Sequence, residues 1–362
     1  MGLKFEVSHQ IDEIEWNQKL QDNKASTTYQ IPNWAKVYRS FKSKPIFITV
    51  RNGSGEIEGQ LLALIHNDII WDESNFFVKT IGTKLNLRKT LTWFYGPIIH
   101  DDENFDQITL LILQALDFVS NKYKITMIKG SFHPFLKQPS TKLLIKNGYD
   151  IQPWATFITD LKKSKDEFYE SLGKKTRYDI RKSEKNELEF VVSKNRSDFS
   201  DLIKLKTLEN KVGGKIRNHP LFYDDHWKYL HKYGYEKLFL AKSKGQTIAA
   251  ILNIVFNGNV IQHGVAVSSR KELLGGPFLT WNAINWCINM NQSTYDMGGI
   301  NPNPKNEKEK SMNFYKSKWG GNKVDYLRIT KILNPFKQKF SAVLTNPQKL
   351  FMYKKLKSSQ SI

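Results

Sequence analysis

Residues 156–190, TFITDLKKSKDEFYESLGKKTRYDIRKSEKNELEF, contain the pattern that decides the class of fold. Apolar and β-branched residues dominate Thr156–Leu161, which predicts a strand. Ser164 and Glu167 form a capping box, which predicts that a helix starts there, and helical spacing continues through Lys185. Leu188–Ser193 again has the pattern of a strand. A strand, helices and a second strand in so short a stretch indicate a mixed α/β fold.

The same order of elements occurs twice along the chain. Each copy has a long apolar helix, a strand that ends near glycine, a shorter helix and a second turn with glycine. The first copy covers 104–149 and the second covers 277–321. Two copies of one α/β unit is the economical interpretation. The chain of 362 residues is also large for one core. We expect two domains, 1–152 and 153–331, and a basic tail over 332–362.

The composition excludes several classes of protein. Hydrophobic residues make up 40% and aromatic residues 13% of the chain, which is too much for a disordered protein. No apolar run approaches the roughly 18 residues that a membrane-spanning helix needs. The single cysteine, Cys287, excludes a disulfide framework. The histidines do not have the spacing of metal ligands, so we expect no metal. We expect a cytoplasmic protein.

The positive charge is concentrated in the second half of the chain. The net charge is +20. Residues 1–150 contain 18 basic and 16 acidic residues, whereas residues 151–362 contain 37 and 19. A lysine-rich surface without a function would give both halves a similar excess of positive charge. The asymmetry predicts a polyanionic partner for the second half: nucleic acid, a phosphorylated substrate or an anionic membrane surface.

Three segments in the second half contain candidate functional residues. In the predicted helix around KKTRYDIRK (174–182), Arg177 and Arg181 share one face and could clamp a phosphate. The alternative is a solvated basic helix, paired with Asp179 and Glu184. The other two segments are YDMGGINP (295–302) and FYKSKWGG (314–321). The first is consistent with a tight turn, and the lysines of the second with an ordinary cationic helix C-terminus or with an inward-pointing charge.

In this order, the three segments resemble the FemABX family of aminoacyl and peptidyl transferases. QIPNWAKVY (30–38) and FYGPIIH (94–100) fit the N-terminal segments of that family more loosely. The resemblance implies an α/β fold of two tandem GNAT-like acyltransferase domains. No long charged heptad stretch is visible, which favours the shorter, FemX-like architecture without a coiled-coil arm.

The resemblance also implies an activity. It predicts transfer of an amino acid from aminoacyl-tRNA to an amino group of a peptidoglycan or other cell-envelope precursor. The partners would be aminoacyl-tRNA and a phosphorylated or nucleotide-linked peptide precursor, with no further cofactor. We expect a monomer, and association with the inner face of the membrane is left open.

The family's motifs assign roles to individual residues. Lys316, after Tyr315, matches the lysine that stabilises charge on the reacting oxygens, so these two are the predicted catalytic residues. Lys318 does not match. The predicted substrate-binding residues are Arg177, Tyr178, Arg181, Lys182, Asp296, Gly298, Gly299, Trp319 and Gly320.

Two alternatives remain open from the sequence. One is a GNAT N-acyltransferase that uses acyl-CoA. RKELLGGP (270–277) lies where such enzymes bind pyrophosphate, but its glycines come two residues late and Pro277 follows them. The other is a non-catalytic protein of the same fold that binds RNA or a membrane.

Overall fold

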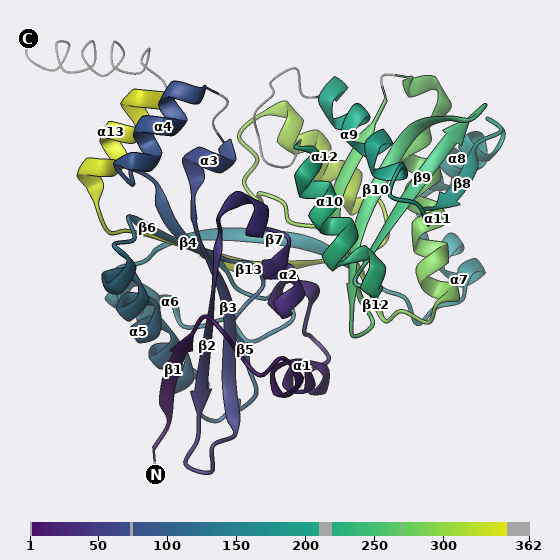
Figure 1. The fold of residues 1–362 in the computed structure, drawn as a ribbon. Helices are drawn as coiled ribbons and strands as arrows, with labels where there is room; N and C mark the ends of the chain where they lie inside the picture. The colour runs from purple at the N-terminus through teal and green to yellow at the C-terminus, as the bar shows by residue number, and fades with distance from the viewer. Residues whose placement is uncertain (1, 73–74, 210–218, 269, 346–362) are drawn as a thin grey trace, which may run out of the picture.

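The computed structural model describes residues 2–72, 75–209, 219–268 and 270–345. Within these residues the strands form one mixed sheet of 13 strands, flanked by helices (Figure 1). The strands are β1 (Lys4–Ser8), β2 (Lys44–Arg51), β3 (Ile57–Asn67), β4 (Lys89–Trp93), β5 (Ile98–Ile99), β6 (Met127–Ser131), β7 (Asp150–Asp160), β8 (Glu189–Val192), β9 (Glu236–Ser243), β10 (Gln246–Phe256), β11 (Asn259–Val267), β12 (Thr294–Asp296) and β13 (Asn322–Ile332). The α-helices are α1 (Glu13–Asp22), α2 (Pro32–Lys36), α3 (Asp68–Asp72), α4 (Phe76–Lys84), α5 (Phe105–Tyr123), α6 (Thr141–Lys146), α7 (Lys165–Ser171), α8 (Lys174–Glu184), α9 (Asp198–Glu209), α10 (Pro220–Tyr229), α11 (Gly275–Asn289), α12 (Glu307–Ser317) and α13 (Pro335–Thr345).

The two halves of the chain exchange their last strands. The strand order is β1-β2-β3-β4-β6-β13-β7-β12-β11-β10-β9-β8. In the first half β4 and β6 are parallel, and in the second half β11 and β12 are parallel. The first half ends with β7, which pairs with β12 of the second half, whereas β13 of the second half pairs with β6 of the first. The repeat expected over 104–149 and 277–321 therefore appears as α5-β6-α6-β7 and α11-β12-α12-β13.

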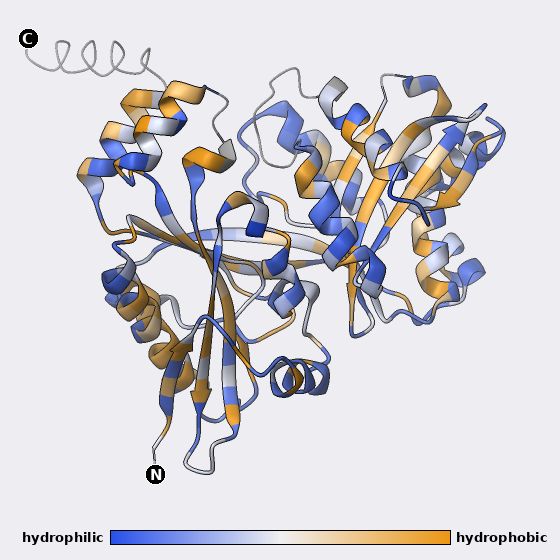
Figure 2. Cartoon of the chain, viewed as in Figure 1, coloured by the Kyte–Doolittle hydropathy of each residue, from blue (hydrophilic) through white to orange (hydrophobic). Residues whose placement is uncertain are grey.

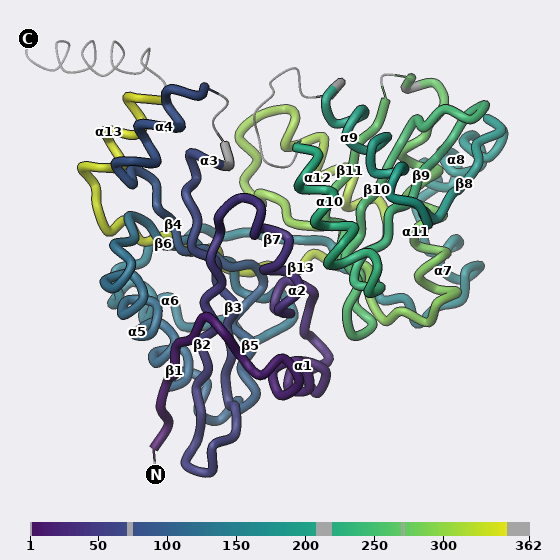
Figure 3. Tube along the Cα trace, viewed as in Figure 1, coloured from purple at the N-terminus to yellow at the C-terminus, as the bar shows by residue number. Residues whose placement is uncertain are grey.

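The exchange makes the sheet continuous between the halves. β7 and β13 lie antiparallel and pair from Asn322↔Ile158 to Thr330↔Asp150, and Figure 3 shows the chain crossing there. The expected boundary at Gln152-Pro153 falls inside β7, so the polypeptide passes from one half to the other within a strand. The division into domains 1–152 and 153–331 stays a prediction.

Three buried clusters hold the described residues together. One lies under α5 in the first half and another under α11 in the second. The third joins the halves, because Trp16 and Trp34 of the first half share it with Phe222 and Leu238 of the second. Figure 2 shows the apolar strands facing the helices in both halves. This aromatic packing against both halves positions one half on the other.

Several elements differ from the sequence pattern. The stretch 93–99, which is strand-like in sequence, is divided: β4 ends at Trp93, the chain bends at Phe94 and Tyr95, and β5 begins at Ile98. The stretch 32–41 has a helical pattern in the sequence, but α2 stops at Lys36 and a short 3-10 helix follows over Arg39–Phe41. The helix expected from Pro277 starts at Gly275, which leaves the proline in the first turn, where it is tolerated.

The expected tail begins with a further helix. Asn334 accepts a hydrogen bond from the backbone N–H of Lys337 at 2.9 Å and caps α13, in which proline is the first residue. This N-terminal signal is present in the sequence. Residues 346–362 of the expected tail lie outside the described part of the chain.

Candidate active site

The sheet opens at two places, once in each half. In the second half β11 and β12 pair in parallel as far as Ile261↔Asp296. Beyond this pair the strands separate, and the edge of β11 that faced β12 has no partner strand in the described residues. In the first half β4 and β6 pair as far as Trp93↔Gly130. Each opening lies where an extended substrate could reach backbone groups at the sheet.

A bulge and two glycines form the opening in the second half. The register between β10 and β11 shifts at Leu252/Asn253, so His263 is an extra residue on β11. Gly298 has φ +77°, and a Cβ there would lie 2.8 Å from the carbonyl oxygen of Gln262. A Cβ on Gly299 would lie 2.5 Å from Trp154 Nε1. These glycines bring the chain after β12 close to β11 and to the first half.

Lys316 on α12 lies at this opening. Its Nζ donates to the carbonyl oxygen of Gly298 at 2.8 Å and to that of Gly299 at 3.2 Å. An ammonium has three N–H donors. Two of them have partners among the described residues, so one N–H is left for a ligand. Burial lowers the pKa of Lys316 to about 8, and the negative charge of Asp296 opposes this shift. The side chain is therefore a cation held in place that loses its proton at a lower pH than an ordinary lysine.

Asp296 is the buried carboxylate behind this lysine, with 2% of its surface exposed. Burial raises its pKa. Hydrogen bonds from Thr156, from Gly298 N at 2.7 Å and from the Tyr95 hydroxyl at 3.1 Å oppose that shift, as does the charge of Lys316. The carboxylate orients the glycine turn that holds Lys316.

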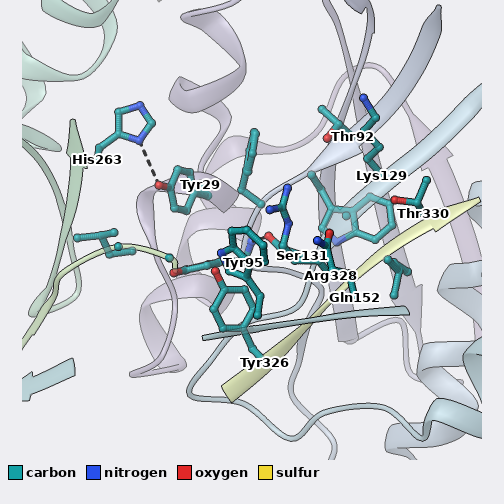
Figure 4. A pocket seen from close by; sticks show the side chains of 18 of the residues that line it. Tyr29, Thr92, Tyr95, Lys129, Ser131, Gln152, His263, Tyr326, Arg328 and Thr330 are labelled. Carbon is teal, nitrogen blue, oxygen red and sulfur yellow. Dashed lines mark hydrogen bonds between the residues drawn. The ribbon is translucent and has the colours of Figure 1, made fainter. Parts of the chain in front are cut away.

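The first half supplies tyrosines to the same place. Gln30 is buried, and its side chain donates to Phe94 O at 2.8 Å and accepts from Leu62 N at 2.8 Å. It thereby couples the segment of Tyr29 to the turn of Tyr95. Tyr95 itself has φ +42°, an uncommon value for an aromatic residue. The Tyr29 hydroxyl lies 3.1 Å from His263 Nδ1 (Figure 4).

Two clefts meet at Lys316. The central cleft, of about 620 Å³, runs between the openings of the two halves and is lined by residues of both (Figure 4). The α11 cleft, of about 700 Å³, lies between β11, α12 and the start of α11, and its lining includes Val265, Pro277 and Met312. Lys316, Gln262 and His263 line both clefts. Two substrates could therefore approach the same ammonium from different sides.

Five of the eleven predicted site residues line the clefts or lie directly behind them. Lys316, Gly298 and Gly299 line the central cleft, with Asp296 directly behind them. Tyr315 lines the α11 cleft, where its hydroxyl lies 2.9 Å from the hydroxyl of Thr280. Burial raises the pKa of Tyr315 to about 12.

The basic helix α8 lies apart from both clefts. It packs inward through Thr176 and Ile180. Arg177 forms an ion pair with Glu170, and Arg181 donates to the Tyr169 hydroxyl at 3.2 Å. Neither arginine lines either cleft, and the same holds for Tyr178 and Lys182, which are exposed. The phosphate clamp on α8 stays a prediction, now for a surface outside the clefts.

The end of the third segment lies outside both clefts, and the role in substrate binding predicted for Trp319 and Gly320 stays a prediction. Trp319 is fully buried in the core under α11. Gly320 has φ +76° and ends the chain's helical path after α12. Lys318 forms an ion pair with Asp179 at 2.9 Å. None of these side chains lines either cleft.

Sequence reasoning missed the residues that the first half and β11 contribute. Tyr29, Tyr95 and His263 line the central cleft. The first two lie in or beside the segments 30–38 and 94–100, so the motif signal was present although it named no role. His263 has no such signal, because its position depends on a bulge.

The described residues contain no cluster of three or more side chains arranged to hold a metal ion. No helix among them is both long and apolar enough to cross a bilayer.

Comparison with known proteins defines the fold as a tandem GNAT-like acyltransferase fold. No family model matches the sequence, and no curated protein matches it. The structure is similar to the crystal structure of FemX, with TM-score 0.70 and 15% identity over 93% of this chain and 100% of that one. It is also similar to a tandem GNAT protein from the clavulanic acid biosynthesis pathway, with TM-score 0.53 and 12% identity over 91% of this chain and 98% of that one.

A third similar structure is that of L-PGS from Bacillus licheniformis, with TM-score 0.52 and 13% identity over 92% of this chain and 95% of that one. The chain therefore has the FemX-like fold, which confirms the fold that the resemblance implies.

Proposed function

We propose that this protein is an aminoacyltransferase that moves an amino acid from aminoacyl-tRNA to an amino group of a cell-envelope precursor. The observation that carries the proposal is the position of Lys316, a fixed ammonium with one N–H left for a ligand, where two clefts meet. A transfer reaction needs two substrates at one place, and this geometry provides it.

The chemistry follows from the charges that develop. The acceptor amine attacks the ester carbonyl carbon, a C–N bond forms and the C–O bond to the ribose breaks. The amine loses a proton and the ribose oxygen gains one. Negative charge develops first on the carbonyl oxygen and then on the ribose oxygen. The free N–H of Lys316 stabilises these oxygens, an effect worth about 10²–10³ in rate for one such donor.

The two clefts receive different substrates in this proposal. The α11 cleft is bordered by the unpaired edge of β11 and by apolar side chains such as Val265 and Met312, which suit the acyl end of the donor. The central cleft is lined by polar side chains of both halves, which suit a polar acceptor. The excess positive charge in residues 151–362 supports a donor with many phosphates.

A second candidate is an N-acyltransferase that uses acyl-CoA. It is favoured by the start of α11, where Gly275 and Gly276 border the α11 cleft. The backbone N–H groups of a helix N-terminus can bind a pyrophosphate. Pro277 supplies no N–H, which weakens this candidate.

Binding measurements separate the two donors. For charged tRNA we expect an affinity that falls steeply with salt, because each phosphate contact contributes a slope of about −0.7 to −0.9 to a plot of log K against log salt. Acetyl-CoA should bind weakly or not at all. Tight binding of acetyl-CoA with no salt-dependent binding of tRNA would favour the second candidate.

A further inference from the structure

The central cleft has a strongly polar end in the first half. Six polar side chains from four adjacent strands line it, in two rows across the sheet. One row consists of neighbours in register on β6, β13 and β7, and the other of neighbours on β4, β6 and β13; the members are Ser131, Arg328 and Gln152, and Thr92, Lys129 and Thr330. Figure 4 shows these side chains together on one side of the cleft. We call this set the anion arm.

A polar face in the centre of a sheet is unusual. The other face of β13 is apolar there, and Leu327 and Ile329 pack on the core under α5. Central strands normally bury both faces or cover them with helices. The anion arm instead opens into a cleft, which is the arrangement expected for a binding surface.

Arg328 is the strongest group of the anion arm. It forms no ion pair with a carboxylate in the described residues, and it is exposed to the cleft. Its Cζ lies 4.5 Å from the centroid of the Trp154 ring. This cation–π contact fixes the plane of the guanidinium and leaves its N–H donors for a ligand.

A second positive charge is held nearby. Lys129 Nζ lies 2.6 Å from a carboxylate oxygen of Asp68. The same carboxylate contacts His66 at 2.8 Å and Arg88 at 3.5 Å. The carboxylate of Asp68 is thus shared by Lys129, His66 and Arg88. Arg328 adds a positive charge that no carboxylate among the described residues pairs.

We propose that the anion arm binds a carboxylate or phosphate group of the acceptor. A guanidinium and an ammonium together are suited to an anion with several oxygens. The acceptor's amine would then reach Lys316 at the other opening of the same cleft. The assignment to the acceptor rests on the proposed function, whereas the binding of an anion does not.

The test is a direct binding measurement without a donor. Pyrophosphate serves as the phosphate probe and glutarate as the carboxylate probe, and the fluorescence of the protein, which includes Trp154, reports binding. We expect at least one of the two probes to bind. Arg328→Gln should raise the Kd of that probe about tenfold or more, the scale of a lost charged hydrogen bond. Arg328→Lys should lie between, since it keeps the charge and loses the planar fork.

Lys323→Gln is the matched control, because Lys323 is a basic residue on the same strand that lies outside the cleft. Equal Kd values for wild type and Arg328→Gln, or binding of neither probe, would overturn the proposal. If Arg328-dependent binding is found but no transfer from tRNA occurs, the anion arm stands and the proposed function fails.

A second inference rests on a different surface. Helices α4 and α13 pack against each other at one end of the first half (Figure 1). Each carries two exposed phenylalanines, with exposed fractions of 84% for Phe76, 68% for Phe77, 78% for Phe336 and 42% for Phe340. Single exposed apolar residues are common, but four aromatic rings on two neighbouring helices mark an interaction surface.

The charge of this surface indicates the kind of partner that it binds. Residues 75–99 and 326–362 contain no aspartate or glutamate. The two helices carry Lys79, Lys84, Lys337 and Lys339. Exposed aromatic rings beside lysines, on two helices that themselves carry no acid, are features of a surface that inserts into an anionic bilayer. We infer that α4 and α13 dock on an anionic membrane surface.

Vesicle sedimentation tests this inference. The full chain should bind vesicles of phosphatidylglycerol and phosphatidylcholine, and not vesicles of phosphatidylcholine alone. Phe76→Ser with Phe336→Ser should weaken binding about tenfold or more, because two buried rings are lost from the bilayer. Ile14→Ser, a change at an apolar residue with 83% exposure on α1, should leave binding unchanged.

Circular dichroism would show that each variant is folded. Equal binding of the double variant and wild type to the anionic vesicles would overturn the inference. If the wild type forms a dimer, the double variant is a monomer and neither binds vesicles, the surface would belong to contact with a second copy of the chain instead.

Discussion

The hydroxyl of Tyr95 donates to the carboxylate of Asp296 at 3.1 Å, between residues that are 201 positions apart. Tyr95 belongs to the turn after β4 of the first half, and Asp296 ends β12 of the second. Asp296 in turn accepts from Gly298 N, and the carbonyl of Gly298 accepts from Lys316. One chain of hydrogen bonds therefore runs from the first half to the candidate catalytic ammonium.

Tyr95→Phe should destabilise the fold by about 1–3 kcal/mol, since a buried charged acceptor loses a donor. It should also raise the pKa of Asp296 further, because this hydrogen bond lowers it. Chemical denaturation measures the free energy of unfolding. Tyr149→Phe is the control: its buried hydroxyl has no partner among the described residues, so its loss should be nearly neutral. Equal effects of the two changes would contradict the role given to Tyr95.

Lys316→Met should leave the protein folded and lower kcat by about 10²-fold or more, the scale of a lost oxyanion donor. Lys318→Met removes a lysine two residues away whose partner is Asp179 and which lines neither cleft. It should change kcat little. Single-turnover rates with each variant decide the matter, and a wild-type rate for Lys316→Met would remove this lysine from the mechanism.

The activity should fall as pH rises through about 8. The pKa of Lys316 lies below that of an ordinary lysine, so its proton is lost on the alkaline side of that value and the stabilising charge disappears. Lys316→Arg should move this limb of the kcat/KM profile to higher pH, because guanidinium stays protonated. An alkaline limb that does not move would show that another group titrates. Ionisation of the acceptor amine acts in the opposite sense, because the amine attacks in its neutral form.

Gly298→Ala should destabilise the fold by about 1–3 kcal/mol through its left-handed backbone, and should also lower kcat. The added Cβ would lie 2.8 Å from the Gln262 carbonyl oxygen, so the glycine turn, whose carbonyl groups hold the ammonium of Lys316, must shift. Gly245→Ala has the same φ of +77° with no atom within 4 Å of the new Cβ. It should reproduce the backbone strain and leave kcat unchanged. A normal kcat for Gly298→Ala would mean that the turn does not position Lys316.

Local patterns in the sequence are sufficient for most elements of the fold. The capping box of Ser164 and Glu167 is present at the start of α7, as predicted. The repeat predicted two related units, and both are present. The exchange of β7 and β13 could not be read from periodicity, because a strand's pattern of burial does not specify which neighbour it pairs with.

Only the part of the candidate site that is built from residues close in sequence could be predicted. Lys316, Gly298 and Gly299 lie in motifs where residues close in sequence act together. Arg177 and Arg181 share a helix face as expected, but the direction of that face depends on how Thr176 and Ile180 pack. His263 reaches the cleft through a bulge, and Arg328 through the exchanged strand. Both depend on long-range pairing.

The most direct test of the account is a single-turnover transfer assay with the purified protein, a radiolabelled aminoacyl-tRNA and an acceptor that carries a free amine. We predict that the labelled amino acid appears in an amide bond to the acceptor. The transfer should be abolished by ribonuclease and should not be supported by acetyl-CoA. Robust transfer from acetyl-CoA by the ribonuclease-treated enzyme, with none from charged tRNA, would contradict the account.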